Sequence, residues 1–121
     1  MTLRTVLLVD DDPDLRMIGE LALRQVGGLA VTVAASGAEA LALAAAAPPD
    51  VILLDVQMPG LDGPATLAQL RADPRTAAIP VVFLTAGGRG AALADADVHG
   101  LIRKPFDPMT LADQLRALMA G

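Results

Sequence analysis

The fold is decided by a stretch near the N-terminus that reads TVLLVDDDPDLR, residues 5–16. It begins with a near-continuous apolar run, Thr5–Val9, which is typical of a strand buried on both faces of a parallel sheet. Three acids follow, and Asp12 stands directly before Pro13, a combination that favours a helix cap and a first helical residue. A buried strand that turns through acids into a helix predicts an α/β architecture.

Four later segments repeat the strand pattern. Each is a short run rich in branched aliphatic residues. Most lack the alternation of apolar and polar residues that marks a strand with one solvent-exposed face. The five predicted strands are Thr5–Val9, Ala30–Ala34, Val51–Leu54, Val81–Thr85 and Gly100–Ile102.

Helical signals lie between these strands. Asp12-Pro13 opens the first predicted helix, and Gly27-Gly28 ends it. Ser36 with Glu39 forms a capping box that opens a second, alanine-rich helix, which Pro48-Pro49 stops. Three more helices are predicted, after Asp62, over Ala91 to Ala96, and from Asp107-Pro108.

Strand and helix alternate five times, which predicts a doubly wound (βα)₅ sandwich with a five-stranded parallel sheet and right-handed crossovers. We expect one domain over residues 1–121, with a core of about residues 4–119 and no output domain. In open sheets of this kind, ligands bind at the carboxyl ends of the strands.

The composition excludes several classes of function. The 121 residues carry a net charge of −5 and no cysteine, which argues against a nucleic-acid surface, disulfides and thiolate metal sites. The longest uncharged stretch, Gln25–Ala38, is shorter than the roughly 18 apolar residues of a membrane span, and the N-terminus does not resemble a signal peptide. We therefore expect a cytoplasmic protein that does not contact a membrane.

Chemically active side chains follow four of the predicted strands. They are Asp10, Asp11 and Asp12 after the first strand, Asp55 after the third, Thr85 at the end of the fourth, and Lys104 after the fifth. Because the carboxyl ends of parallel strands share one edge, we expect these side chains to lie together. Two carboxylates about 4 Å apart repel by on the order of 4 kcal/mol at an effective dielectric of about 20. Such a cluster either protonates or binds a cation, and an all-oxygen site suits Mg²⁺.

Asp55 and Lys104 point to phosphoryl chemistry. A carboxylate can attack phosphorus to form an acyl phosphate. Lys104 is the only lysine in the chain, and an ammonium is a good partner for phosphate. The hydroxyl of Thr85 can donate a hydrogen bond to the same group. Pro105, which follows the lysine, is a candidate for a cis peptide bond.

Plain structural interpretations remain open for several of these residues. Asp12 fits a helix cap better than a metal ligand, and Asp14 fits a first-turn acid that favours the helix dipole. Thr85 by itself fits a β-branched strand end, Lys104 an ordinary surface lysine, and His99 a solvated loop residue.

Four segments together resemble the receiver domain of two-component response regulators. They are residues 6–13 (VLLVDDDP), 51–63 (VILLDVQMPGLDG), 81–86 (VVFLTA) and 104–106 (KPF). They occur in the family's order and cover essentially the whole chain. The resemblance, and not the sequence pattern, implies a flavodoxin-like fold similar to the chemotaxis regulator, with strand order 2-1-3-4-5.

The resemblance also implies a role for each residue of the site. Asp55 is the expected phosphoacceptor. The expected ligands of Mg²⁺, or of Mn²⁺ in its place, are Asp10 through a water, Asp11, Asp55 and the backbone carbonyl of Gln57. The expected partners of the phosphoryl group are Thr85, the backbone N–H of Ala86, and Lys104. The implied donor is a phosphohistidine on a sensor histidine kinase or a histidine phosphotransfer protein.

Two departures from the family pattern concern the output. Receivers usually carry Tyr or Phe three residues before the lysine, as a switch residue, and this chain has Leu101 there. The interval from Thr85 to Lys104 is also about three residues shorter than usual, roughly one helical turn, which predicts a shortened fourth helix.

Other functions remain open at this stage. A pseudo-receiver would use the same fold as an interaction module without phosphorylation, and Leu101 gives this alternative some support. A metal-dependent phosphatase would need a second acid where Gln57 stands, and a flavodoxin-like cofactor binder would not place three acids at its phosphate loop. We expect no enzymatic activity beyond self-phosphorylation from a phosphodonor and autodephosphorylation.

Overall fold

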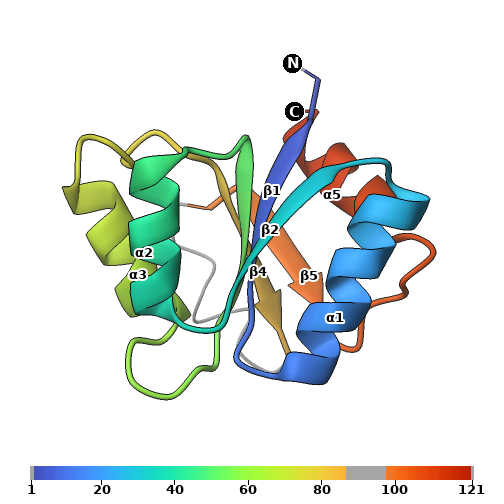
Figure 1. The fold of residues 1–121 in the computed structure, drawn as a ribbon, viewed down its shortest axis with the longest axis horizontal. Helices are drawn as coiled ribbons and strands as arrows, with labels where there is room; N and C mark the ends of the chain where they lie inside the picture. The colour runs from blue at the N-terminus through green and yellow to red at the C-terminus, as the bar shows by residue number, and fades with distance from the viewer. Residues whose placement is uncertain (1, 87–97, 121) are drawn as a thin grey trace.

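The computed structural model describes residues 2–86 and 98–120. Its centre is a five-stranded sheet in the order β2-β1-β3-β4-β5, and every adjacent pair is parallel. The strands are β1 (Thr5–Val9), β2 (Ala30–Ala34), β3 (Val51–Asp55), β4 (Val81–Thr85) and β5 (Gly100–Arg103) (Figure 1). The predicted parallel sheet and the strand order implied by the resemblance are both confirmed.

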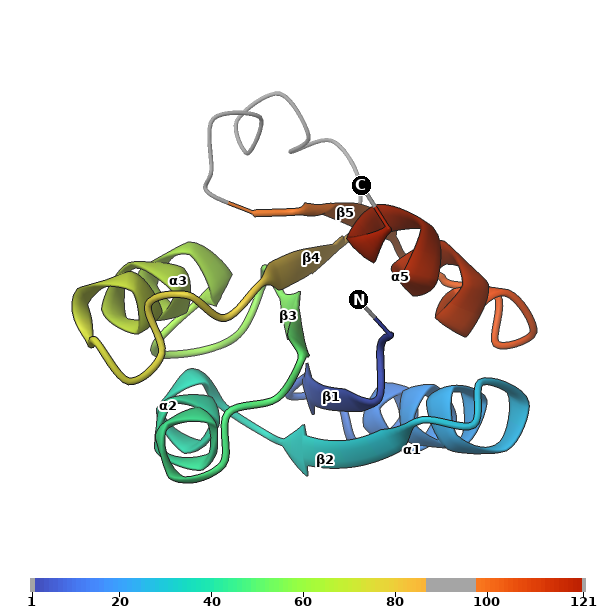
Figure 2. The same cartoon turned by 90° about the horizontal axis from the view of Figure 1, so that it is seen from above.

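Helices cover both faces of this sheet. The described helices are α1 (Pro13–Leu21), a π-helical turn η1 (Ala22–Val26), α2 (Gly37–Ala46), α3 (Gly63–Ala72) and α5 (Leu111–Met119). Figure 2 shows α1 and α5 on one side of the sheet and α2 and α3 on the other. The helix predicted over Ala91 to Ala96, and with it the predicted shortening, lies outside the described residues. No helix in the described part of the chain is long and apolar enough to cross a bilayer.

Alternate side chains of each inner strand enter two separate cores. On β1, Leu8 packs in the core beneath α1 and α5, while Leu7 packs in the core beneath α2 and α3. On β3, Leu53 and Leu54 divide in the same way. All four leucines are almost completely buried, and each full burial contributes about 1.5–3 kcal/mol. The absence of polar alternation in these strands therefore follows from burial on both faces.

Side-chain caps start three of the helices where the sequence predicts them. Asp12 Oδ1 accepts hydrogen bonds from the backbone N–H groups of Asp14 (2.9 Å) and Leu15 (3.3 Å). Ser36 and Asp62 accept equivalent bonds at the starts of α2 and α3. These bonds satisfy first-turn N–H groups that have no partner within the helix. Asp12 is thus a helix cap, as its position before Pro13 predicts.

Some boundaries differ from the predicted ones. α5 begins at Leu111 and not at Pro108, because the carboxylate of Asp107 accepts the N–H of Met109 (2.9 Å) and closes a separate turn first. After α1 the helical segment continues into η1. This segment ends at the predicted glycines, where Gly28 has a φ of 69°. β3 and β5 each extend one residue further than predicted, to Asp55 and Arg103.

Candidate functional site

Three carboxylates meet at the carboxyl edge of the sheet. Asp55 is the last residue of β3, and Asp10 and Asp11 directly follow β1, which pairs with β3. Asp10 and Asp55 are 1% and 3% exposed, whereas Asp11 is exposed to solvent. One carboxylate oxygen from each of the three lies within 4.8 Å of the others. The neighbouring acid Asp12 stays outside this acid cluster of Asp10, Asp11 and Asp55, because its carboxylate caps α1.

A single ammonium bridges the two buried acids. Lys104 Nζ lies 3.0 Å from Asp10 Oδ2 and 3.0 Å from Asp55 Oδ1, and the lysine side chain is only 15% exposed. Its backbone N–H donates to the carbonyl of Thr85 at 2.7 Å, which fixes the start of the loop that follows β5. The peptide bond between Lys104 and Pro105 is cis.

The other predicted residues lie around Asp55. Thr85 is buried at the end of β4, the strand that pairs with β3, and Ala86 follows it at the surface. The backbone N–H of Gln57 donates to Asp55 Oδ1 at 3.3 Å, so the loop after β3 folds back on the carboxylate. A hollow of about 370 Å³, lined by residues 56–59 and Asp62, opens beside this loop.

A glycine allows α3 to begin next to the site. A Cβ built on Gly63 would lie 2.7 Å from the carbonyl oxygen of Asp55 and 2.7 Å from Val56 Cα. Both neighbours are backbone atoms that cannot move aside, so this approach requires a residue without a side chain. Asp62, directly before it, caps α3 through the N–H of Ala65 at 2.9 Å.

Burial and charge shift the ionisation of the site in opposite directions. Burial raises the pKa of Asp55 to about 6, with the hydrogen bond from Lys104 opposing the rise and the charge of Asp10 adding to it. Burial alone would lower the pKa of Lys104, but its interactions with the carboxylates of Asp55 and Asp10 outweigh that effect, so its pKa lies above the ordinary value. The lysine is therefore charged at neutral pH, and Asp55 is half ionised only when the pH reaches its raised pKa of about 6.

These residues fit a hard divalent cation. Three carboxylates against one ammonium leave a net charge of −2 when all are ionised. Oδ2 of Asp10 is buried, and its contact with Lys104 is not directed as a hydrogen bond, so part of its bonding capacity is unused. Because all the donors are oxygens and Asp11 faces solvent, Mg²⁺ suits the cluster and can keep several waters there.

Sequence reasoning missed one residue that touches the site. The guanidinium Nη1 of Arg16, on the second turn of α1, donates to the backbone carbonyl of Asp10 at 2.9 Å. The available signal was weak: an arginine six residues after Asp10, on a helix that starts at Pro13, can reach back to the end of β1.

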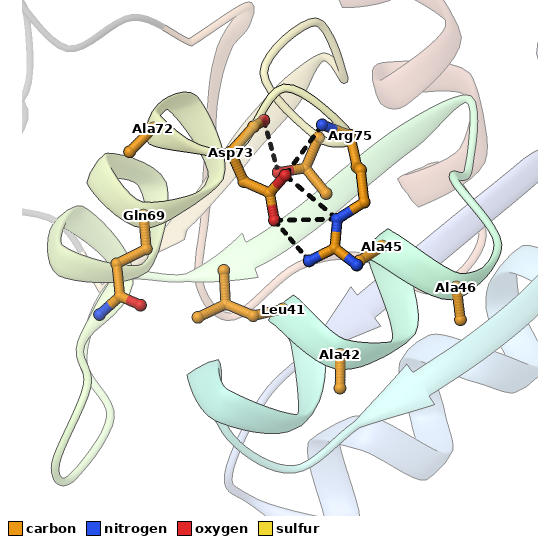
Figure 3. A pocket seen from close by; sticks show the side chains of 9 residues that line it. Leu41, Ala42, Ala45, Ala46, Gln69, Ala72, Asp73 and Arg75 are labelled. Carbon is orange, nitrogen blue, oxygen red and sulfur yellow. Dashed lines mark hydrogen bonds and ion pairs between the residues drawn. The ribbon is translucent and has the colours of Figure 1, made fainter.

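A larger groove lies between α2 and α3, away from the acid cluster. It measures about 610 Å³, and none of the acid cluster residues lines it. Figure 3 shows Leu41 and alanines of α2 on one side, Gln69 and Ala72 of α3 on the other, and Arg75 paired with Asp73 at 2.8 Å. Four of its nine lining residues are alanines and its two charged residues are paired with each other, so this groove offers no chemistry comparable to that around Asp55.

Leu101 occupies the position where the family's switch aromatic is expected. It lies on β5 opposite Phe83 of β4 and packs, partly buried, against the core beneath α2 and α3. Phe83 itself is fully buried in that core.

Comparisons with known proteins agree with this geometry. The model of the response regulator receiver domain matches residues 6–116. PilH of Pseudomonas aeruginosa is 35% identical over 119 residues, covering 96% of this chain and 98% of PilH. RpaA of Synechocystis sp., a DNA-binding dual master transcriptional regulator, is 36% identical over 117 residues, which are 94% of this chain but 48% of RpaA. The chain therefore spans about half the length of that relative.

Solved structures give the same result. The chemotaxis response regulator CheY4 of Vibrio cholerae superposes with a TM-score of 0.87 at 32% identity, covering 97% of this chain and 99% of CheY4. The fold, the acid cluster with its bridging lysine, and the match over residues 6–116 show that this chain is a member of the response regulator receiver domain family of two-component systems.

Proposed function

We propose that Asp55 accepts a phosphoryl group from a phosphohistidine and that the phosphorylated domain signals by a change of conformation or by partner binding. One observation carries this proposal: the buried Asp55 carboxylate lies 3.0 Å from the Lys104 ammonium and within reach of two further acids. This arrangement supplies a nucleophile, a fixed positive charge and a cation site at one strand end.

The reaction uses the ionised form of Asp55. One carboxylate oxygen forms a bond to phosphorus while the P–N bond of the donor breaks, and the electron pair of that bond returns to the imidazole nitrogen. The ammonium of Lys104 holds the negative charge of the transferring group. The hydroxyl of Thr85 and the backbone N–H of Ala86 are the proposed donors to the phosphoryl oxygens.

Asp10, Asp11, Asp55 and the backbone carbonyl of Gln57 are the proposed holders of Mg²⁺, with Mn²⁺ as a substitute because it also prefers oxygen ligands. When bound, the ion offsets the charge of the acids and of the incoming phosphoryl group. Without it, the net negative charge of the cluster repels an anionic phosphodonor.

The proposed donor protein is a sensor histidine kinase or a histidine phosphotransfer protein. The downstream partner is taken to be a protein and not nucleic acid, since the chain carries a net charge of −5. Leu101 is smaller than the usual aromatic and has no hydroxyl, so we expect a weaker response of β5 to phosphorylation than an aromatic would give.

Intact-mass measurement tests the proposal. The protein is incubated with acetyl phosphate and Mg²⁺, and Asp55→Asn and Asp12→Asn are treated in parallel. We expect one phosphoryl adduct in the wild type and in Asp12→Asn, because asparagine caps a helix as well as aspartate does. We expect none in Asp55→Asn or when EDTA removes the metal. An unmodified wild-type protein would support a pseudo-receiver instead.

A further inference from the structure

Each polar group of Asp10 has a neighbour, although Oδ2 makes only the ion-pair contact with Lys104 and no hydrogen bond. Its N–H donates to the carbonyl of Ala34 on β2 at 3.1 Å, and its Oδ1 accepts from the N–H of Asp12 at 2.9 Å. Its Oδ2 faces Lys104, and its carbonyl oxygen accepts from Arg16 Nη1 at 2.9 Å. The first three contacts hold the residue and its carboxylate, whereas the contact from Arg16 holds the peptide group that leads to Asp11.

Asp11 has no comparable support of its own. It is the exposed member of the acid cluster, and within residues 2–86 and 98–120 its carboxylate accepts no hydrogen bond. Because the peptide unit is planar, fixing the carbonyl oxygen of Asp10 also fixes the direction of the Asp11 N–H and the place of its Cα. The guanidinium of Arg16 therefore controls where the Asp11 side chain starts.

We propose that Arg16 is a positioning residue for the cation site, and that it acts by holding the peptide group between Asp10 and Asp11 so that Asp11 stays within the acid cluster. This inference rests on the proposed binding of Mg²⁺. Arg16 pairs with no carboxylate in the described part of the chain, so its action is on geometry and not on the charge of a ligand.

The direction in which Mg²⁺ affinity changes when Arg16 is removed separates a positioning role from a purely electrostatic one. Removing a positive charge close to three carboxylates would tighten Mg²⁺ binding if charge alone mattered. If Arg16 holds Asp11 in place, removing it weakens Mg²⁺ binding, by about tenfold for the loss of a supporting hydrogen bond to a ligand.

Arg24 provides a matched control on the same helical stretch. Its guanidinium also donates to a backbone carbonyl, that of Val31 on β2, and forms a surface ion pair with Glu20. Arg24→Gln therefore removes the same charge and the same type of bond at a place outside the acid cluster.

The experiment compares wild type, Arg16→Gln, Arg16→Lys and Arg24→Gln by ¹H–¹⁵N NMR. A Mg²⁺ titration gives each dissociation constant, and ¹⁵N relaxation of the metal-free proteins gives the order parameter of the Asp11 amide. We expect a roughly tenfold weaker Mg²⁺ complex and a lower Asp11 order parameter in Arg16→Gln, a smaller change in Arg16→Lys, and wild-type values in Arg24→Gln. Arg16→Lys keeps the test available should Arg16→Gln not fold.

Each other outcome has one meaning. Unchanged or tighter Mg²⁺ binding in Arg16→Gln, or an unchanged Asp11 order parameter, overturns the role of Arg16. A wild-type protein that binds no Mg²⁺ overturns the proposed function, and the relaxation data on the metal-free protein then still decide whether Arg16 holds Asp11.

Discussion

Replacement of Asp55 by asparagine should stabilise the metal-free protein, although it removes the proposed phosphoacceptor. Asp55 is 3% exposed, and burial raises its pKa to about 6 even with Lys104 beside it. The ionised form is therefore held in the folded protein at a cost. Asparagine has almost the same shape, stays neutral, and can still accept a hydrogen bond from Lys104 through its carbonyl oxygen.

The sign and size of the effect follow from the pKa difference. The pKa of Asp55 in the folded protein, about 6, lies above the ordinary value of 3.8. Protonated Asp55 therefore stabilises the fold, and this stabilisation is complete below the ordinary pKa of 3.8. It is lost as the pH rises through the folded-state pKa of about 6. Between about pH 5 and about pH 7.5 the wild type loses about 1 kcal/mol through this group, after allowance for solvent screening. The asparagine variant does not show this loss.

Urea unfolding measures the difference. The protein has neither Trp nor Tyr, so far-UV circular dichroism is the suitable probe. EDTA keeps both proteins metal-free, and each is unfolded at about pH 5 and about pH 7.5. We expect the stability advantage of Asp55→Asn over wild type to grow by about 1 kcal/mol between the two. An advantage that does not change with pH, or a variant less stable than wild type at the higher pH, would refute the account of Asp55.

Three further predictions concern two residues that support the site and one residue at the opposite, amino edge of the sheet. Lys104→Met leaves Asp10 and Asp55 without their shared ammonium, so urea unfolding near neutral pH should show a loss of about 2 kcal/mol; an unaltered midpoint would contradict the bridging role. Gly63→Ala should cost about 1–3 kcal/mol in urea unfolding because its Cβ meets backbone atoms at 2.7 Å, and an unchanged unfolding midpoint would be inconsistent with this contact. Asp50 accepts the N–H groups of Arg4 and Thr5, and the bond from Arg4 contributes most to holding its pKa below the ordinary value. Its stabilising effect is thus present above that value and is lost as pH falls. Asp50→Ala should lower stability by about 1 kcal/mol near neutral pH in thermal unfolding, with the gap closing in acid; a gap that widens in acid would reverse the sign.

Most of the fold was predictable because each strand is marked by a run of apolar residues within its own short segment of sequence. The runs around Leu7 and Leu53 contain no polar position, and burial on both faces is the physical reason. Helix starts were also predictable, because each capping residue lies directly before the helix turn that it caps. These residues are Asp12, Ser36 and Asp62. The strand order was not carried by any such pattern and came from the family resemblance.

Other features depend on contacts that have no local signature. η1 follows α1 without a sequence signal, and α5 starts late because Asp107 closes its own turn. The topology of parallel strands did predict one feature of the site, because the carboxyl ends of such strands share one edge. That feature is the meeting of Asp10, Asp55 and Lys104. The bond from Arg16 to the carbonyl of Asp10 was not predicted, because a long side chain on an exposed helix can take many directions.

The central claim is that the phosphoryl group is accepted by Asp55 and by no other acid at this edge. The most direct measurement is to load the protein from acetyl phosphate with Mg²⁺, reduce the acyl phosphate with borohydride, which converts a phosphorylated aspartate to homoserine, and map the product by peptide mass spectrometry. The account predicts homoserine at position 55 and unchanged residues at positions 10, 11 and 12. Homoserine at any of those three positions, or none in a protein shown to be folded, would contradict it.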